Sequence, residues 1–162
     1  MRNDIAWIPI SNSQWVKVSL EDLEKIISIP WSISPHGYAK HSKHGLMHRL
    51  LLDAVKGSYV DHINGDRLDN TRENLRLCTH SQNLRNRGAT ASSKSGWKGV
   101  STNKPHTDRW RATITADCGQ VHVGYFDSSE DAATAYNFAA YELHGEFAQF
   151  NTVPQPWLEE AA

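Results

Sequence analysis

An acid, two imidazoles and an amide lie close together in the middle of this 162-residue chain. Asp61 and His62 are adjacent at the end of an expected strand, and His80 and Asn83 are three residues apart on one face of an expected helix. Carboxylate and amide oxygens suit Mg²⁺ and similar ions, which keep positions open for water and phosphate. Because a neutral imidazole beside such an ion can deprotonate water, these residues predict metal-assisted phosphodiester hydrolysis.

The same residues also have a plainer explanation. Asp-His pairs are common, Asn64-Gly65-Asp66 is an everyday turn, and a single histidine is usually a hydrogen-bonded surface or core group. Spacing alone therefore leaves a catalytic and a merely structural role open.

Strand, turn and helix signals indicate how these side chains are positioned. We expect a strand over 59–63, a long loop, a strand over 75–78 and a helix over 79–85. In an extended strand Asp61 and His62 point to opposite faces, so a turn at Asn64-Gly65 must bring them to one pocket.

Three shorter elements are expected before this unit. Ser19 starts a short helix that Pro30 stops, and residues 31–34 and 38–41 form a hairpin. Apolar residues from Leu46 to Val55 recur at helical spacing, so a second helix should end near Gly57.

The C-terminal part reads as a second folding unit. The polar stretch 88–96 is the expected linker, and residues 97–101, 109–115 and 120–126 read as strands of an antiparallel sheet. Ser128 caps a helix whose apolar stripe is expected to pack on that sheet. The stripe comprises Ala132, Ala135, Tyr136, Ala139 and Leu143, and the acidic tail 154–162 follows at the end. The predicted fold class is therefore α+β.

Charge is unevenly distributed although the formal net charge is −1. Residues 36–126 carry fourteen Lys and Arg against seven Asp and Glu, whereas 127–162 carry seven acids and no Lys or Arg. A basic stretch of this kind can follow a phosphate backbone. An ordinary solvated face explains the same excess equally well.

Cysteine content and hydropathy restrict the remaining classes. Cys78 and Cys118 are isolated, so any metal must be held by oxygen and imidazole rather than by four thiolates. No apolar run reaches the roughly 18 residues of a membrane span, and the N-terminus lacks a secretion signal. We expect a cytoplasmic protein without a membrane segment.

Several spaced elements within residues 46–87 point to one family. They are His48-Arg49-Leu50, Val60 to Asp66, Leu68-Asp69-Asn70, Asn74-Leu75-Arg76 and Thr79 to Asn83. Together they closely resemble the HNH homing endonucleases that are common in bacteriophage genomes. The resemblance implies an HNH endonuclease domain over 1–87, with a ββα-metal core at about 58–87 that binds one divalent ion, Mg²⁺ or Mn²⁺.

The resemblance also implies a role for each motif residue. His62 matches the general base, Asp61 the metal-binding acid before it, and Asn74 the asparagine that braces the loop and holds the histidine ring. Asn83 matches the second metal ligand, with His80 as the competing candidate.

Residues 97–151 resemble the DNA-binding domain of the APETALA-two and ethylene-response-factor group. The likeness rests on Trp97 to Val100, Trp110 to Ile114, Val123 to Phe126 and the alanine-rich helix after Glu130. It implies a domain over 97–153 in which a three-stranded sheet, backed by one helix, lies in the major groove. On the sheet face we place Lys98, Ser101, Asn103, Arg109, Arg111, Thr113, Thr115 and His122. Few of these are arginine, so positioning through phosphates competes with base reading.

Further DNA contacts are expected in the nuclease part. Arg49 is assigned to a phosphate contact or, equally well, to a structural ion pair, and Arg76, Arg85 and Arg87 are candidate DNA contacts. The favoured hypothesis is a monomeric endonuclease acting on double-stranded DNA, in the host cytoplasm if a phage encodes it. A single active site per chain favours nicking. The alternatives are a non-catalytic, sequence-specific DNA-binding regulator and, less favoured, an RNA-directed enzyme.

Overall fold

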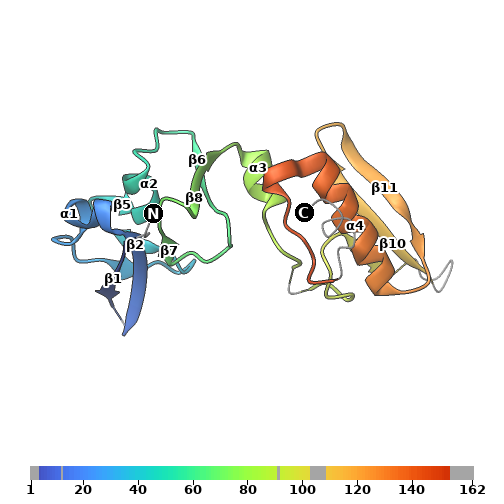
Figure 1. The fold of residues 1–162 in the computed structure, drawn as a ribbon, viewed down its shortest axis with the longest axis horizontal. Coiled ribbons are helices and arrows are strands. Elements are labelled where there is room, and N and C mark those ends of the chain that lie inside the picture. Colours follow the sequence, from blue (N-terminus) through green and yellow to red (C-terminus); the bar gives the residue numbers. More distant parts are fainter. Residues whose placement is uncertain (1–3, 12, 91, 103–108, 154–162) are drawn as a thin grey trace. The chain divides into compact units, whose positions relative to one another are not determined.

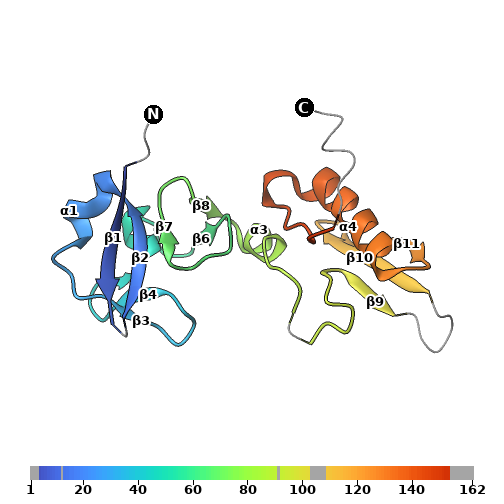
Figure 2. The ribbon, with the colours of Figure 1, turned by 60° about the horizontal axis from the view of Figure 1, so that its bottom comes forward.

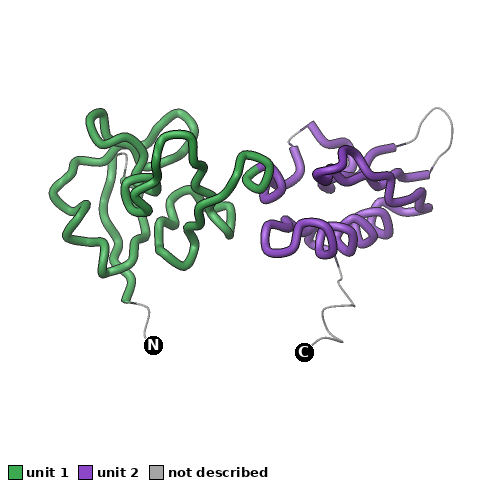
Figure 3. The backbone as a smooth tube through the Cα atoms, turned by 90° about the horizontal axis from the view of Figure 1, so that it is seen from above, with its two compact units in different colours: residues 1–83 green, residues 84–162 purple. Residues whose placement is uncertain are grey.

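A computed structural model describes residues 4–11, 13–90, 92–102 and 109–153 of the chain. They form two compact units, residues 1–83 and 84–162, which Figure 3 colours separately. The first unit combines small sheets with short helices, and the second combines one sheet with a helix. The α+β prediction is therefore confirmed. Segment 88–96, the predicted linker, belongs to the second unit, while Asn103 and the tail 154–162 lie outside the described residues.

The first unit opens with a hairpin that lies outside the elements predicted from the sequence. Strands β1 (Ile5–Ile10) and β2 (Gln14–Ser19) are antiparallel, and β7 (Asp69–Asn70) adds to β2 in parallel. Alternate apolar residues of the hairpin point inward and are buried. They are Ile8, Ile10, Val16 and Val18. The sheet thereby brings the loop around residue 69 onto the N-terminal hairpin (Figure 2).

The next elements follow the predicted order, at reduced length. A 3₁₀ turn (Leu20–Asp22) leads into α1 (Leu23–Ile26), and the Ser19 side chain makes no cap bond but accepts from the Arg72 amide. Strands β3 (Ser32–Ile33) and β4 (Ala39–His41) form the expected hairpin, to which β5 (Gly45–Leu46) adds.

The helix predicted from Leu46 to Val55 is shorter than its apolar periodicity suggests. Helix α2 covers only Met47–Leu51, because Asp53 takes a positive φ of 47° that ends the helical path. Its apolar face still enters the core through Met47 and Leu51, both fully buried.

The central unit follows the predicted strand, loop, strand and helix order. Strand β6 (Tyr59–His62) pairs antiparallel with β8 (Leu75–Cys78), and α3 (His80–Arg85) follows directly (Figure 1). The chain turns after His62, where Gly65 takes a φ of 76° and donates its amide to the His62 carbonyl at 2.9 Å. The turn expected at Asn64-Gly65 is therefore present.

The second unit is a three-stranded antiparallel sheet packed on one helix, as expected. Strands β9 (Val100–Thr102), β10 (Trp110–Ala116) and β11 (Gly119–Phe126) run in the order β11-β10-β9, and α4 (Ser129–His144) lies across one face (Figures 1 and 2). The first strand begins three residues later than predicted, because Gly96 and Gly99 take left-handed turns before it.

Helix α4 begins as predicted but buries a rotated face. Ser128 accepts the Asp131 amide, while Leu143 of the predicted stripe is 45% exposed. Mostly small and polar side chains face the sheet. The buried Asn137 amide donates to the Asn151 carbonyl, and the buried His144 imidazole bonds to the Thr115 carbonyl. The buried set is Ala132, Ala133, Tyr136, Asn137, Ala140 and His144. No helix in the described part is both long and apolar enough to cross a membrane.

Candidate active site

Asp61 and His62 are neighbours on β6 but meet different partners. Asp61 lies opposite Arg76 of β8, whose Nε and Nη2 donate to the same carboxylate oxygen, Oδ2, at 2.9 and 2.8 Å. Both side chains are largely buried, with 6% and 12% exposed. The acid proposed as a metal ligand is thus held in an ion pair within the two-stranded sheet.

His62 lies in a cluster of rings. Its imidazole is 5.0 Å, centroid to centroid, from His48 of α2 and 5.8 Å from Tyr38. His48 in turn lies 5.1 Å from Tyr38, with an edge-on approach. Both imidazoles are buried, with only 5% of each residue exposed, and Tyr38 is half-buried.

Burial keeps both imidazoles neutral near pH 7. It lowers the pKa of His62 more than hydrogen bonding with Asn70 and the nearby negative charges raise it. Those charges are Asp61, Asp66 and Asp69. Burial also lowers the pKa of His48 to about 3, helped by the neighbouring His62 and Arg49. A neutral ring is the form that can accept a proton.

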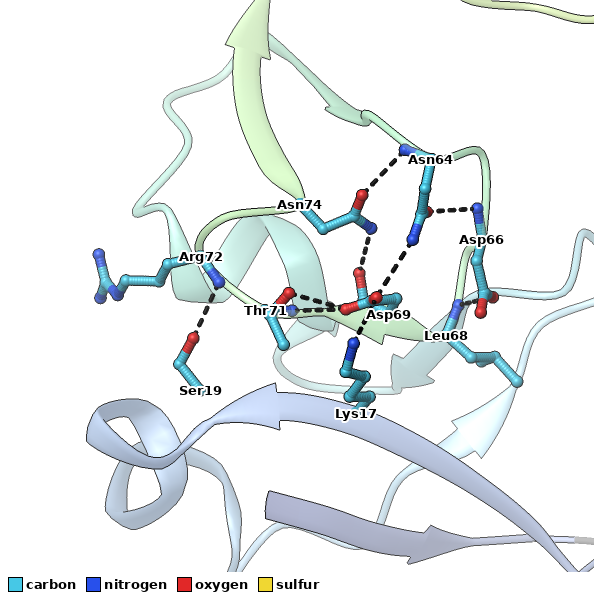
Figure 4. Close-up of polar contacts among 9 residues, drawn as sticks. All are labelled: Lys17, Ser19, Asn64, Asp66, Leu68, Asp69, Thr71, Arg72 and Asn74. Carbon is cyan, nitrogen blue, oxygen red and sulfur yellow. Dashed lines mark hydrogen bonds and ion pairs between the residues drawn. The ribbon is translucent and has the colours of Figure 1, made fainter. Parts of the chain in front are cut away.

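Asn74 braces the chain immediately after His62. Its Oδ1 accepts the Asn64 amide at 2.9 Å, its Nδ2 donates to the Asp69 carbonyl at 2.7 Å, and its own carbonyl accepts the Ile63 amide. Asn74 is buried, and Figure 4 shows its two side-chain bonds, to Asn64 and Asp69. These bonds join the loop after His62 to the start of β8, and the role of Asn74 at the His62 ring stays a prediction.

Asp69 anchors the same loop from its other end. Its carboxylate accepts from Lys17 of β2 at 3.0 Å, from the Thr71 hydroxyl at 2.8 Å and from Asn64 at 3.1 Å. The charge of Lys17 and the Thr71 hydrogen bonds lower the pKa of Asp69 despite its burial. The loop that carries the candidate site is therefore fixed by side-chain bonds to β2 and to itself (Figure 4).

Helix α3 starts at a reciprocal cap. Thr79 donates its amide to the Gln82 side chain at 2.8 Å, and Gln82 donates its amide to the Thr79 hydroxyl at 3.2 Å. This cap places His80 and Asn83 at the start of the helix, where the His80 ring lies 5.1 Å from the Tyr59 ring. Asn83 is half-buried, and its side chain makes no hydrogen bond to the described residues.

The candidate metal ligands do not belong to a group of several metal-binding side chains among the described residues. Within the described ranges, no three or more His, Cys, Asp and Glu side chains gather as a metal-binding group. The sequence hypothesis uses one carboxylate, Asp61, and one amide, Asn83, and such oxygen donors suit Mg²⁺, which keeps much of its own water.

The candidate DNA-contact arginines of the nuclease part are largely engaged. Arg49 donates to the carbonyls of Ala54, Val55 and Ser58 at 3.1, 2.8 and 2.6 Å, so it braces the chain before β6. Arg85 pairs with Asp117 within the second unit, Arg76 pairs with Asp61 as described, and Arg87 is exposed.

The candidate DNA-contact residues of the second unit fall into two groups. Arg111, Thr113, Thr115 and His122 lie on the sheet face opposite the buried Ala112 and Ile114, and Ser101 pairs with Arg111 across the strands. The other two basic side chains are engaged elsewhere. Lys98 donates to the Arg85 carbonyl, and burial lowers its pKa to about 8, while Arg109 pairs with Asp127 at 3.0 Å.

The structure adds three residues that motif matching did not place at the site. In the sequence, His48 belongs to the His48-Arg49-Leu50 element, Tyr38 to the expected hairpin, and Arg67 to the long loop between the two expected strands. Tyr38 and His48 contact the His62 ring, and the Arg67 Cζ lies 5.0 Å from the Tyr38 ring centroid. Local spacing gives no signal for such contacts, because they join separate segments of the chain.

Comparisons with known proteins identify the region around this site. A sequence model of the HNH endonuclease family matches residues 46–85. The chain is 32% identical over 144 residues to the uncharacterized HNH endonuclease L560 of Acanthamoeba polyphaga mimivirus, covering 84% of this chain and 74% of the relative. It is 40% identical over 95 residues to Protein 3.8 of Escherichia phage T7, covering 59% of this chain and 77% of that protein. No solved structure matches the chain.

Proposed function

The chain belongs to the HNH endonuclease family, and we propose that it is a divalent-metal-dependent DNA endonuclease with His62 as general base. The buried, neutral His62 imidazole carries the proposal, because it stands at the end of β6 directly after Asp61 in the chain. The homing type and the phage setting belong to the proposal as well, and the relative from phage T7 supports the latter.

His62 supplies the proton transfer in this proposal. A ring nitrogen takes a proton from water as the water oxygen attacks phosphorus, and one phosphorus–oxygen bond of the DNA backbone breaks. Asn74 keeps the His62 turn in place through its bonds to Asn64 and Asp69. His48 and Tyr38 keep bulk water away from the imidazole and so favour its neutral form.

Asp61 and Asn83 would hold one Mg²⁺ or Mn²⁺, with His80 as the alternative to Asn83. Their carboxylate and amide oxygens fit such an ion chemically, and Arg76 pairs with the Asp61 carboxylate at 2.8 Å. When bound, the ion would stabilise negative charge on the phosphate and on the leaving oxygen.

The second unit would add DNA affinity. The open face of β9, β10 and β11 presents Arg111, Thr113 and His122 next to the exposed ring of Tyr125, which lies 4.6 Å from His122. A β-surface of this kind fits the major groove, and a tethered second contact strengthens binding without a new interface. Its likeness to the APETALA-two group is part of this proposal.

Cleavage of supercoiled plasmid tests the central claim. The parent chain is expected to nick or cut with Mg²⁺ or Mn²⁺ and to be inactive with a chelator, while His62→Ala should lose roughly 100- to 10,000-fold in rate yet still bind DNA. His44→Ala, which removes an exposed imidazole of the same unit, is the matched control and should cut like the parent. A His62→Ala chain with parental activity would instead favour a DNA-binding regulator.

Two further variants identify the second ligand. If Asn83 binds the ion, Asn83→Ala should weaken Mg²⁺ binding measured by calorimetry, whereas His80→Ala should leave it close to the parental value. The reverse result would assign that position to His80. If both variants bind Mg²⁺ as tightly as the parent, neither residue of α3 is a metal ligand.

A further inference from the structure

Arg67 is held in a fixed position beside the ring cluster of the active site. Its Nη1 donates to the His36 carbonyl at 2.7 Å, and its Cζ lies 5.0 Å from the Tyr38 ring centroid. Its side chain also runs along Gly37, whose missing Cβ would lie 3.8 Å from the Arg67 Cδ. A carbonyl, an aromatic face and a glycine backbone thus orient this one guanidinium.

The contacts form a path from solvent to the proposed base. Arg67 is exposed, Tyr38 is half-buried and His62 is buried. The Tyr38 ring links the two residues, since its centroid lies 5.0 Å from the Arg67 Cζ and 5.8 Å from the His62 ring centroid. A group bound by Arg67 would therefore be one ring contact away from the proposed base.

Among the described residues of the first unit, Arg67 differs from the other guanidinium groups in what it binds. Arg72 pairs with Asp22, Arg76 pairs with Asp61, and Arg49 is taken up by three carbonyls. Within the described part of the unit, Arg67 forms no ion pair with a carboxylate. No carboxylate among the described residues therefore pairs with its positive charge.

The hydrogen bond to His36 uses the Nη1 side of the group. The opposite edge of a guanidinium, formed by Nε and Nη2, is the edge that binds two oxygens of a phosphate at once. We propose that Arg67 is a phosphate-binding residue of the active site, positioned by Tyr38 and His36 to take a backbone phosphate of DNA next to His62. This inference rests on the proposed endonuclease function, because it takes the bound phosphate to be part of the DNA substrate.

Salt titration of DNA binding tests the contact without requiring cleavage. Each phosphate contact contributes about −0.9 to the slope of log K against log salt concentration. In a His62→Ala background, Arg67→Gln should flatten that slope by about 0.9 for a short duplex, whereas Arg67→Lys should keep it. Lys94→Gln removes one exposed positive charge from the second unit and serves as the charge-matched control.

Cleavage kinetics supply the second readout in chains that retain His62. Arg67→Gln should lower kcat/KM roughly 10- to 100-fold, since a charged hydrogen-bond partner of the phosphate is lost. Arg67→Lys should lower kcat/KM several-fold, because it keeps the charge but not the two parallel N–H donors of a guanidinium. Lys94→Gln should match the parent. An Arg67→Gln chain that equals Lys94→Gln in both slope and kcat/KM would overturn the proposal.

Two further outcomes distinguish failure of the Arg67 proposal from misfolding and from failure of the endonuclease proposal. If Arg67→Gln does not fold, as judged by thermal unfolding, Arg67→Lys decides, and full parental kcat/KM in that variant would contradict the proposal. If the parent binds DNA without cutting it, the endonuclease proposal fails, while the salt slope of Arg67→Gln still decides whether Arg67 binds a phosphate.

Discussion

Both units have an apolar core, but the loop of the candidate site in the first unit and the sheet of the second unit are held in different ways. In the first, the loop between β6 and β8 is held by side-chain bonds, with Asn74 and Asp69 as its main anchors. In the second, a sheet and a helix approach closely over small apolar residues such as Ala112, Ala133 and Ala140, all fully buried. Directional bonds can fix a reactive group at one point, whereas close packing gives a stable surface. The difference therefore fits catalysis in the first unit and binding in the second.

The close packing of the second unit should be the most sensitive feature of the chain. Gly99 has a φ of 73°, and a Cβ there would lie 2.2 Å from the Tyr136 ring and 2.6 Å from the Thr113 carbonyl oxygen. Gly99→Ala should cost the second unit roughly 3 kcal/mol or more, because both the backbone and the packing are strained. Amide hydrogen exchange, resolved by unit, measures this loss.

Gly96 provides the matched control. Its φ is 75°, and a Cβ there would meet nothing within 4 Å, so Gly96→Ala should cost only about 1 kcal/mol. Equal losses in the two variants would mean that backbone conformation, rather than packing against Tyr136, limits this unit. Protection of β6 and β8 amides should not change in either variant.

The polar bracing of the first unit is tested at Asn74. Asn74→Ala leaves the Asn64 amide and the Asp69 carbonyl without their buried partner, so the first unit should lose about 2 kcal/mol. Cleavage should fall further than DNA binding, because the turn after His62 loosens. Urea unfolding and plasmid cleavage measure the two effects.

Asn64→Ala removes a similar amide from an exposed position of the same loop. Its bond to the Asp66 amide is exposed and its bond to the Asp69 carboxylate is only part-buried, so we expect a loss of less than about 1 kcal/mol. If Asn64→Ala destabilised the unit as much as Asn74→Ala, burial of the bonds would not explain the rigidity of the loop.

Acid should weaken the first unit through its buried imidazoles. Burial lowers the pKa of His48 from 6.5 to about 3, so between these values the unfolded chain binds more protons than the folded one. Stability therefore falls as the pH drops below about 6.5, by about 1 kcal/mol at pH 5.5 from this residue alone. Unfolding in urea across this pH range measures the slope.

His48→Gln isolates that contribution. The variant should show a shallower decline with acid, while the part due to His62, whose pKa is also lowered by burial, remains. An unchanged slope would show that His48 is not held neutral in the folded protein. His144 in the second unit shifts in the same direction for the same reason, so its neighbouring amides should respond to acid as well.

Exposed ion pairs should contribute least, and equally little in both units. Arg109 and Asp127 of the second unit are 51% and 89% exposed, and Lys25 and Asp53 of the first are 36% and 78% exposed. Asp127→Asn and Asp53→Asn should each change stability by less than about 0.5 kcal/mol, because water and salt screen the pairs and because Asn tolerates the positive φ of residue 53. A larger effect in thermal unfolding for either one would single out that pair as part of a tighter network.

Local signals in the chain were sufficient to predict several elements of both units. The order of β6, β8 and α3 follows from apolar alternation and turn residues, and Ser128 marks the start of α4. The three-stranded sheet of the second unit follows from the same kind of pattern. Errors arose at ends and faces. The helix from Leu46 stops at Leu51, and α4 turns His144 rather than Leu143 inward.

Some residues of the candidate site could likewise be proposed from the sequence, and others could not. Asp61, His62, Asn74 and Asn83 could be proposed from motif spacing, because neighbouring residues carry that information. The contacts of Tyr38 and His48 with His62, and of Arg67 with Tyr38, could not, since each joins separate segments of the chain. Engagement of Arg49 by carbonyls and of Arg76 by Asp61 was equally hidden from the residue types alone.

Residue order therefore specifies which chemistry this protein can attempt and which segments become strands or helices, because periodicity and turn preference act over a few neighbours. Contacts across tens of residues decide three further properties. They decide whether His62 is neutral, which arginine is left without an ion pair among the described residues, and which loop packs on β2. Burial and long-range pairing set these properties, and they exist only once the chain has folded.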